Sequence, residues 1–275
     1  YLAFSGGTPQ SNYRASFGVM DHNTIIKKMD YNVFVAKVDV TQKAFNDRLT
    51  GEFGVFGSSF KNHDIFDTQM LFYSAACQNP TFPAGTDEHG NWLKNESATH
   101  VNPPGILLEE KNDSKDLNFD AHIKLSYDFN KNWRVSTFGS YLYGSTENGQ
   151  FCPTWVWAQG NVYRGEFKKE EWLGNVSLDF NKEFGIHKVS AGVSSEYRKL
   201  RKTAFWVYAK GIPTNDFHYD NLGATAARPY GGTESTYEDQ SLASVMGSIT
   251  YNLLDRYTLA VNARGDGSSM VGDNN

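Results

Sequence analysis

The chain has 275 residues, with 26 Lys and Arg against 31 Asp and Glu, so its net charge is −5 at pH 7. This acidic balance argues against a nucleic-acid binder, whose footprint is basic, and the 15% aromatic content argues against a disordered chain. Cys77 and Cys152 are too few for a disulfide scaffold or a four-cysteine zinc module. No apolar run approaches the roughly 18 residues of a spanning helix, but strands that cross a membrane alternate and escape that test.

Alternation of apolar and polar residues is the dominant pattern along the chain. In residues 118–129 every odd position from Phe119 onward is apolar, and every even position from Asn118 onward is polar. The same period of two recurs in residues 12–20, 171–181, 187–198 and 257–264, and it is typical of β-strands with two different faces. We predict strands over residues 1–6, 11–21, 32–43, 49–59, 117–129, 132–146, 162–182, 187–206, 239–252 and 256–265.

The connections between these strands alternate in length. Tight turns join every second pair, whereas long segments rich in Pro, Gly, Asn and Asp occupy residues 60–116, 147–161 and 207–238, with a shorter one at 22–31. Residues 64–77 are compatible with a short helix. Short turns at one end and long loops at the other are typical of transmembrane β-barrels. The sequence therefore predicts an all-β fold, an antiparallel transmembrane β-barrel segment of about ten long strands.

The alternating apolar and polar positions predict which way each side chain points, because one side of such a wall meets hydrocarbon. We expect the apolar set to point outward to lipid: Phe119, Ile123, Leu125, Trp172, Val176, Leu178, Leu259 and Val261. We expect the polar set to point into the lumen: Asp120, His122, Lys124, Asn175, Asp179 and Asn262. Tyr127, Trp133, Trp172, Tyr251 and Tyr257 lie near strand ends on the apolar parity, where aromatic girdles occur at membrane interfaces.

Nothing in the sequence indicates catalysis. The seven histidines are scattered without zinc-ligand spacing, and no nucleophile elbow or phosphate-binding glycine loop is present. The sequence predicts neither an enzyme nor a cofactor or metal site. The Arg264-Gly265-Asp266 tripeptide has the form of an adhesion motif, but a turn or strand-end role is the simpler interpretation.

Aromatic residues in and beside two long loops are the candidate ligand contacts. Trp155, Trp157, Tyr163 and Trp206 present ring faces that stack on sugars or on other apolar surfaces. The alternative is that these rings pack the loops on each other or on a partner. Cys77 and Cys152 lie in loops that we place on the outer, oxidising side, yet they belong to different loops, so the sequence does not predict a bridge between them.

Four groups of motifs carry a resemblance to a known family. They are SGGT at residues 5–8 with NY and ASFG at 12–18, IIK at 25–27 with Asp30 and Tyr31, NP at 102–103 with LLE at 107–109 and NDSK at 112–115, and DRYTL at 255–259 followed by RGDGSS at 264–269. In this order they resemble the SusC/RagA-like branch of TonB-dependent outer-membrane transporters. That resemblance implies a plug domain inside a barrel of about 22 strands.

The resemblance also implies a function for the whole protein. It implies an active importer of oligosaccharides or other large nutrients in the bacterial outer membrane. Its partners would be a SusD-like surface lipoprotein, the TonB complex acting through the plug region, an oligosaccharide or peptide cargo and outer-membrane lipid, with no nucleic acid. A passive porin, a surface-adhesin barrel and a soluble all-β binding module are the alternatives.

A last expectation concerns closure of the sheet. We expect residues 1–275 to be part of the barrel domain, without the plug and the remaining strands. The tilt and shear of a large barrel differ from those of a ten-stranded one. We therefore expect an open, curved sheet in which residues 1–6 do not pair with residues 257–265.

Overall fold

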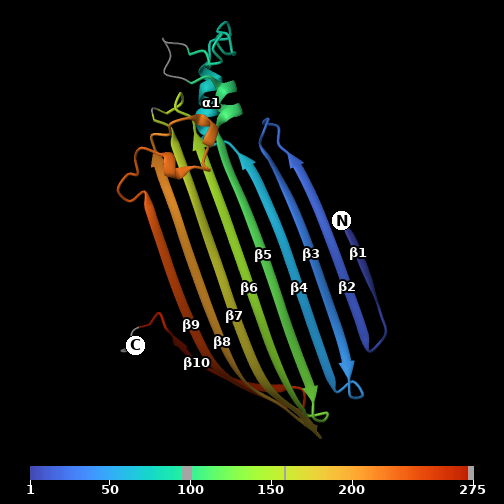
Figure 1. The fold of residues 1–275 in the computed structure, drawn as a ribbon. Helices are drawn as coiled ribbons and strands as arrows, with labels where there is room; N and C mark the ends of the chain where they lie inside the picture. Colours follow the sequence, from blue (N-terminus) through green and yellow to red (C-terminus); the bar gives the residue numbers. More distant parts are fainter. Residues whose placement is uncertain (95–100, 158, 272–275) are drawn as a thin grey trace.

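The computed structural model describes residues 1–94, 101–157 and 159–271, and within them it contains a single antiparallel sheet. Its ten strands follow one another in chain order (Figure 1). They are β1 (Leu2–Gly7), β2 (Ser11–Asn23), β3 (Asp30–Ala44), β4 (Leu49–Asp64), β5 (Lys111–Asp128), β6 (Trp133–Cys152), β7 (Asn161–Phe184), β8 (His187–Lys210), β9 (Thr233–Leu253) and β10 (Tyr257–Ser268). The predicted fold class is confirmed.

The turns at one end of the sheet are tight because their residues suit left-handed or capped backbone. In the β3–β4 turn, Phe45, Asn46 and Asp47 all have positive φ, a conformation that Asn and Asp tolerate better than most residues. In the β5–β6 turn, the side chain of Asn130 accepts hydrogen bonds from the backbone N–H groups of Asn132 and Trp133, at 2.9 and 3.2 Å. We call this the turn end, and the opposite end the loop end.

Several strands extend further toward the loop end than the sequence pattern predicts. β5 begins at Lys111 rather than near 117, β6 continues to Cys152, β8 continues to Lys210, and β9 begins at Thr233 rather than near 239. The predicted loop limits were wrong there because residues 111–116 (KNDSKD) are polar on both faces, so the period of two disappears. The backbone ladder nevertheless continues, with Lys111 paired to Phe151.

Two α-helices lie in the long connection between β4 and β5. α1 (Thr68–Cys77) is capped by Asp67, whose side chain accepts from the Met70 N–H at 2.8 Å, so the predicted helix near residues 64–77 is confirmed. α2 (Pro103–Glu109) was not predicted, although its signal is an Asn102 cap followed by proline in the first turn. None of the helices among the described residues has the length and apolar character to span a membrane.

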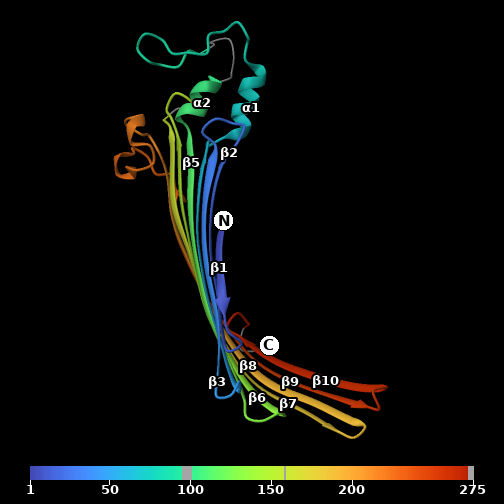
Figure 2. The same ribbon diagram turned by 90° about the vertical axis from the view of Figure 1, so that its right-hand side faces the viewer.

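The sheet is curved, and Figure 2 shows it along its edge. The strands bend toward the side on which β9 and β10 lie, which is the concave side. The segment of residues 211–232, drawn in orange, lies against the opposite, convex side at the loop end (Figure 2). β1 and β10 form the two edges, and no pairing between them occurs in the described residues. The expectation of an open, curved sheet is confirmed.

Candidate functional site

The segment of residues 211–232 identifies which side chains point to the convex face. Its Ile212, Tyr219 and Leu222 pack on Phe151 and Val162, which are 1% exposed. β7 pairs with β6 and β8 without interruption, so the even positions of β7 share the face of Val162. The convex set on β7 therefore includes Trp172, Val176 and Leu178.

The pairing of the other strands shows which of their side chains point to the convex face and which to the concave face. On the convex face it places the whole predicted lipid-facing set, and on the concave face it places the predicted lumen-facing set. The convex residues are solvent-exposed apolar side chains, with Trp172 56% exposed and Leu259 65% exposed. Such a continuous exposed apolar band is unusual on a surface that meets water.

The convex band ends in aromatic rings and then in charges. At the turn end it includes Tyr127, Trp133, Tyr251 and Tyr257. Toward the loop end Tyr141 packs against Trp172 at 4.2 Å between ring centroids, and the next convex positions on β7 are Glu170 and Lys168. Aromatic girdles at both edges of an outward apolar band are typical of barrel walls in membranes.

Near the loop end, the concave face carries a strip of four aromatic side chains from β7 and β8. We call Tyr163, Phe167, Trp206 and Tyr208 the inner aromatic strip. The rings of Phe167 and Trp206 are nearly parallel, 18° apart, with centroids at 6.1 Å. The Tyr208 hydroxyl donates to Asn161 Oδ1 at 2.9 Å. Tyr163 is the direct strand partner of Tyr208.

A polar strip adjoins these rings on β4, β5 and β6. Its uncharged members are Asn62, Ser114, Asn118, Asn148 and Gln150, all on the concave face, and Asp116 lies between Ser114 and Asn118 on that face. Gln150 is the strand partner of Tyr163, and Asn148 is the partner of Gly165, which in turn faces Trp206. Amide and hydroxyl groups beside aromatic rings are suited to binding a polar, uncharged ligand with apolar faces.

A small helical cap covers the loop end between β4 and β6. Ile65, Leu71 and Ile106 form its buried core, with Trp155 packed against them. One carboxylate holds two loops of this cap together, because Glu109 accepts from the indole N–H of Trp92 and, at 2.6 Å, from that of Trp155. Hydrogen bonds to an ionised group are stronger than neutral ones, so this contact ties residues 85–93 to residues 153–157.

A second carboxyl, Glu110, is buried beside the cap. It is 4% exposed, its Oε2 accepts from the Asp67 N–H at 3.1 Å, and its Oε1 accepts from the Cys152 thiol at 3.4 Å. Burial raises the pKa of Glu110 from 4.5 to about 7, and the neighbouring Asp67 carboxylate acts in the same direction. Both cysteines are free thiols, with Cys77 exposed and Cys152 buried.

The segment of residues 211–232 is fastened to the convex face by polar contacts as well as by packing. The Tyr219 hydroxyl donates to Asp113 Oδ2 at 2.5 Å, and Arg164 pairs with Asp220 at 2.8 Å. Burial and the bond to Asp113 raise the pKa of Tyr219. Gly149 lies beneath the Tyr219 ring, where a Cβ would approach it to 2.6 Å.

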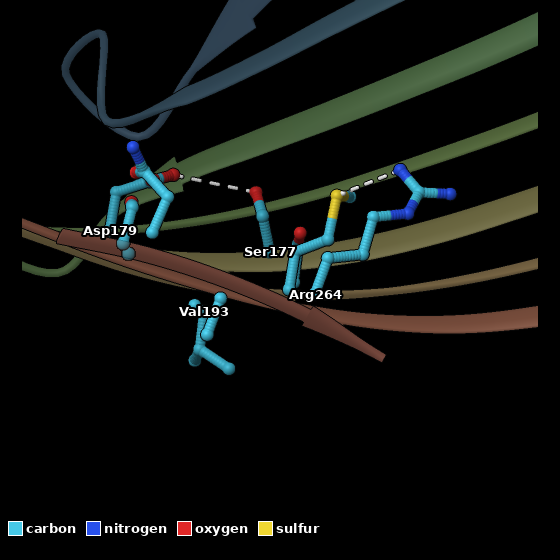
Figure 3. Close-up of a pocket in the computed structure, with 11 residues that line it drawn as sticks. Ser177, Asp179, Val193 and Arg264 are labelled. Atoms are coloured by element: carbon cyan, nitrogen blue, oxygen red, sulfur yellow. Dashed lines mark hydrogen bonds between the residues drawn. The ribbon is translucent and has the colours of Figure 1, made fainter. Parts of the chain in front are cut away.

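A cavity of about 460 Å³ with both polar and apolar lining residues occupies the concave side of β7 to β10 (Figure 3). Figure 3 shows Ser177 and Asp179 on one side of the sheet and Val193 on the other, as the two parities require. Arg264 donates from Nε to Asp266 at 2.8 Å and from Nη2 to Ser244 at 3.1 Å. The Arg-Gly-Asp tripeptide thus lies inside strand β10, in agreement with the simpler interpretation.

The structure places the four predicted contact residues in three environments. Tyr163 and Trp206 lie together on the concave face, whereas Trp155 is packed into the cap and Trp157, 43% exposed, lies in the loop above β6. Sequence reasoning did not select Phe167 or the polar strip. Phe167 could have been selected, because positions 163 and 167 are an even number of residues apart and lie on the same face of a strand.

Comparisons with known proteins agree with this architecture. No family model matches the chain. Over its full length it is 26% identical to TonB-dependent receptor P3 of Formosa agariphila and 24% identical to TonB-dependent receptor SusC of Bacteroides thetaiotaomicron. Together with the folds described next, these matches confirm the resemblance to SusC-like TonB-dependent receptors.

Solved structures show the same fold at low sequence identity. The RagAB peptide importer in its open-open state superimposes with a TM-score of 0.79, at 15% identity, over 99% of this chain and 31% of that chain. The ferric preacinetobactin receptor BauA from Acinetobacter baumannii gives 0.55, at 11% identity, over 98% of this chain and 39% of that one. The sheet is therefore similar to a segment of a TonB-dependent receptor barrel. The chain spans 28% and 29% of the length of the curated relatives P3 and SusC.

Proposed function

We propose that residues 1–275 are part of the barrel wall of a SusC-like, TonB-dependent active importer in the bacterial outer membrane. The observation that carries this proposal is the two-sided sheet, with an exposed apolar convex band between aromatic girdles and a polar concave face. A wall of this kind separates lipid from an aqueous interior. The receptors to which the chain is similar support the importer class over an enzyme.

The proposal includes the cargo and the partners that the family resemblance implies. An oligosaccharide or another large nutrient such as a peptide would pass along the concave face, with a SusD-like lipoprotein at the loop end and TonB acting through a plug region. The inner aromatic strip and the adjoining polar strip are the proposed cargo contacts in this chain. Tyr163 and Trp206 are the predicted residues that lie there, while Trp157 is exposed for contact with cargo or partner above them.

The experiment compares energised uptake with passive leakage. Cells that contain the protein and cells that lack it are given fluorescent oligosaccharides and peptides, with and without a proton uncoupler. An importer takes up at least one cargo class only when the protein is present and the membrane is energised. Uptake that continues unchanged after uncoupling would instead indicate the passive porin.

A matched pair of variants tests the contact residues. Trp206→Ala removes a ring from the concave face, whereas Phe205→Ala removes the neighbouring ring from the convex face. Stacking on one aromatic ring contributes roughly 0.5–1.5 kcal/mol beyond its buried area. We expect about tenfold weaker cargo binding for Trp206→Ala and no change for Phe205→Ala. Equal effects of the two substitutions would contradict the assignment of the concave face.

A further inference from the structure

Two lysines face each other directly on the convex side of the sheet. Lys61 of β4 and Lys115 of β5 are strand partners. Like charges directly opposite each other destabilise a pair of strands. Seven other lysines form ion pairs among the described residues, but neither Lys61 nor Lys115 does.

These lysines line a small cavity, and most of the other charged side chains in its lining already have partners. The cavity has a volume of about 160 Å³. Asp113 accepts from the Tyr219 hydroxyl and lies 3.0 Å from His63, and the Arg164 guanidinium is paired with Asp220. Glu147, the strand partner of Lys115, is the remaining carboxylate in the lining and lies beyond ion-pair distance. The two ammonium groups are thus left free to bind an anion.

The position of the pair along the wall indicates where that anion lies. On β5 the convex positions toward the turn end are Leu117 and Phe119, both exposed and apolar, and Lys115 is the first charge beyond them. On β4 the corresponding first charge is Lys61. If the convex band meets lipid tails, the lysines lie at the level of the lipid headgroups on the loop side.

We propose that Lys61 and Lys115 bind a phosphate carried by an anionic lipid of the outer leaflet. Each ammonium offers three N–H donors, and cross-strand partners are close enough for both to reach one phosphate. The bound anion would also relieve the repulsion between the two lysines. This inference rests on the proposed function, because it requires the convex band to face the membrane.

The experiment uses the protein extracted from the outer membrane in detergent and purified with the rest of its chain. The probes are lipid A carrying its phosphates, lipid A with the phosphates removed, and inorganic phosphate. Native mass spectrometry and the thermal unfolding temperature report binding. We expect phosphorylated lipid A to bind and to raise the unfolding temperature, and K61Q/K115Q to weaken its binding at least tenfold.

The control variant K27Q/K94Q removes the same charge from two exposed loop lysines and is expected to bind lipid A like the wild type. Without lipid, K61Q/K115Q is expected to unfold at the same or a higher temperature, since it removes repulsion. The single variant K115Q gives an intermediate loss of binding and serves if the double variant does not fold.

Three outcomes would overturn the inference: undiminished binding of lipid A to K61Q/K115Q, equal binding of lipid A without phosphates, or full competition by inorganic phosphate. Cell fractionation separates these outcomes from failure of the proposed function. Protein found outside the outer membrane would refute the wall assignment itself. Outer-membrane protein that binds lipid A independently of both lysines would refute only the lysine site.

Discussion

Glu110 is expected to make the helical cap less stable as the pH rises. Its carboxyl is buried between the Asp67 N–H and the Cys152 thiol, and its pKa is raised from 4.5 to about 7. Between these two values the folded cap retains a proton that the opened cap releases. The contribution of Glu110 to the stability of the cap is therefore fully present below pH 4.5 and is lost as the pH rises through 7.

The magnitude follows from the same two pKa values. At 1.36 kcal/mol per pH unit, the difference corresponds to roughly 3 kcal/mol once the pH exceeds 7. The opening equilibrium of the cap should therefore shift by roughly 300-fold across this range. Hydrogen exchange of the amides in α1 (Thr68–Cys77), corrected for the intrinsic pH dependence of exchange, measures that equilibrium.

Glu110→Gln removes the titrating group and retains a side chain that accepts from the Asp67 N–H. We expect the corrected exchange of α1 in this variant to be independent of pH from 5 to 8. Glu88→Gln, which neutralises an exposed carboxylate in the same long loop, should keep the wild-type pH dependence. An unchanged pH dependence in Glu110→Gln would refute the reasoning, and so would a cap that becomes more stable as the pH rises.

Three further predictions test the two faces of the sheet, the segment of residues 211–232 and the cap. Val176→Lys on the convex face should cost about 2–4 kcal/mol in unfolding free energy measured in lipid, whereas Asn175→Lys on the concave face should cost much less. Gly149→Ala should displace the Tyr219 ring and increase proteolysis of residues 211–232 without reducing the amount of folded protein in the membrane. Trp155→Phe removes a hydrogen bond to a carboxylate and should cost the cap about 1.5–3 kcal/mol, measured as faster exchange of α2.

The sequence predicted the part of each strand that has two chemically different faces. In residues 118–129 the alternation is strict, and the structure keeps residues 118–127 in one uninterrupted ladder with β4 and β6. A slip of one residue in strand pairing would turn Phe119 and Ile123 to the polar side. The alternation therefore determines which face of the sheet each side chain occupies. The same reasoning holds for Trp172, Val176 and Leu178.

The sequence did not predict the strand extensions at the loop end, because the physical signal is absent there. Before Leu117 the side chains on both faces of β5 are polar, so residues 111–116 show no alternation of apolar and polar positions. Backbone hydrogen bonds hold this part of the ladder. They form with almost any side chain, so the sequence contains no pattern that predicts them. Both Lys61 and Lys115 lie in such extensions, which is why their pairing became visible only with the strand register.

The candidate contact residues show how far neighbours in the sequence can differ in role. Trp155 and Trp157 are two positions apart, yet the first is anchored by Glu109, 46 residues earlier in the chain, and the second is exposed. No local pattern predicts which indole finds a carboxylate. Tyr163 and Trp206, 43 residues apart in sequence, share one face because β7 and β8 are paired with Gly165 opposite Trp206. Strand register therefore brings together the residues of the proposed cargo contact. The same register places Trp206 and Phe205 on opposite faces, so these two neighbours are a decisive comparison for the proposed cargo binding.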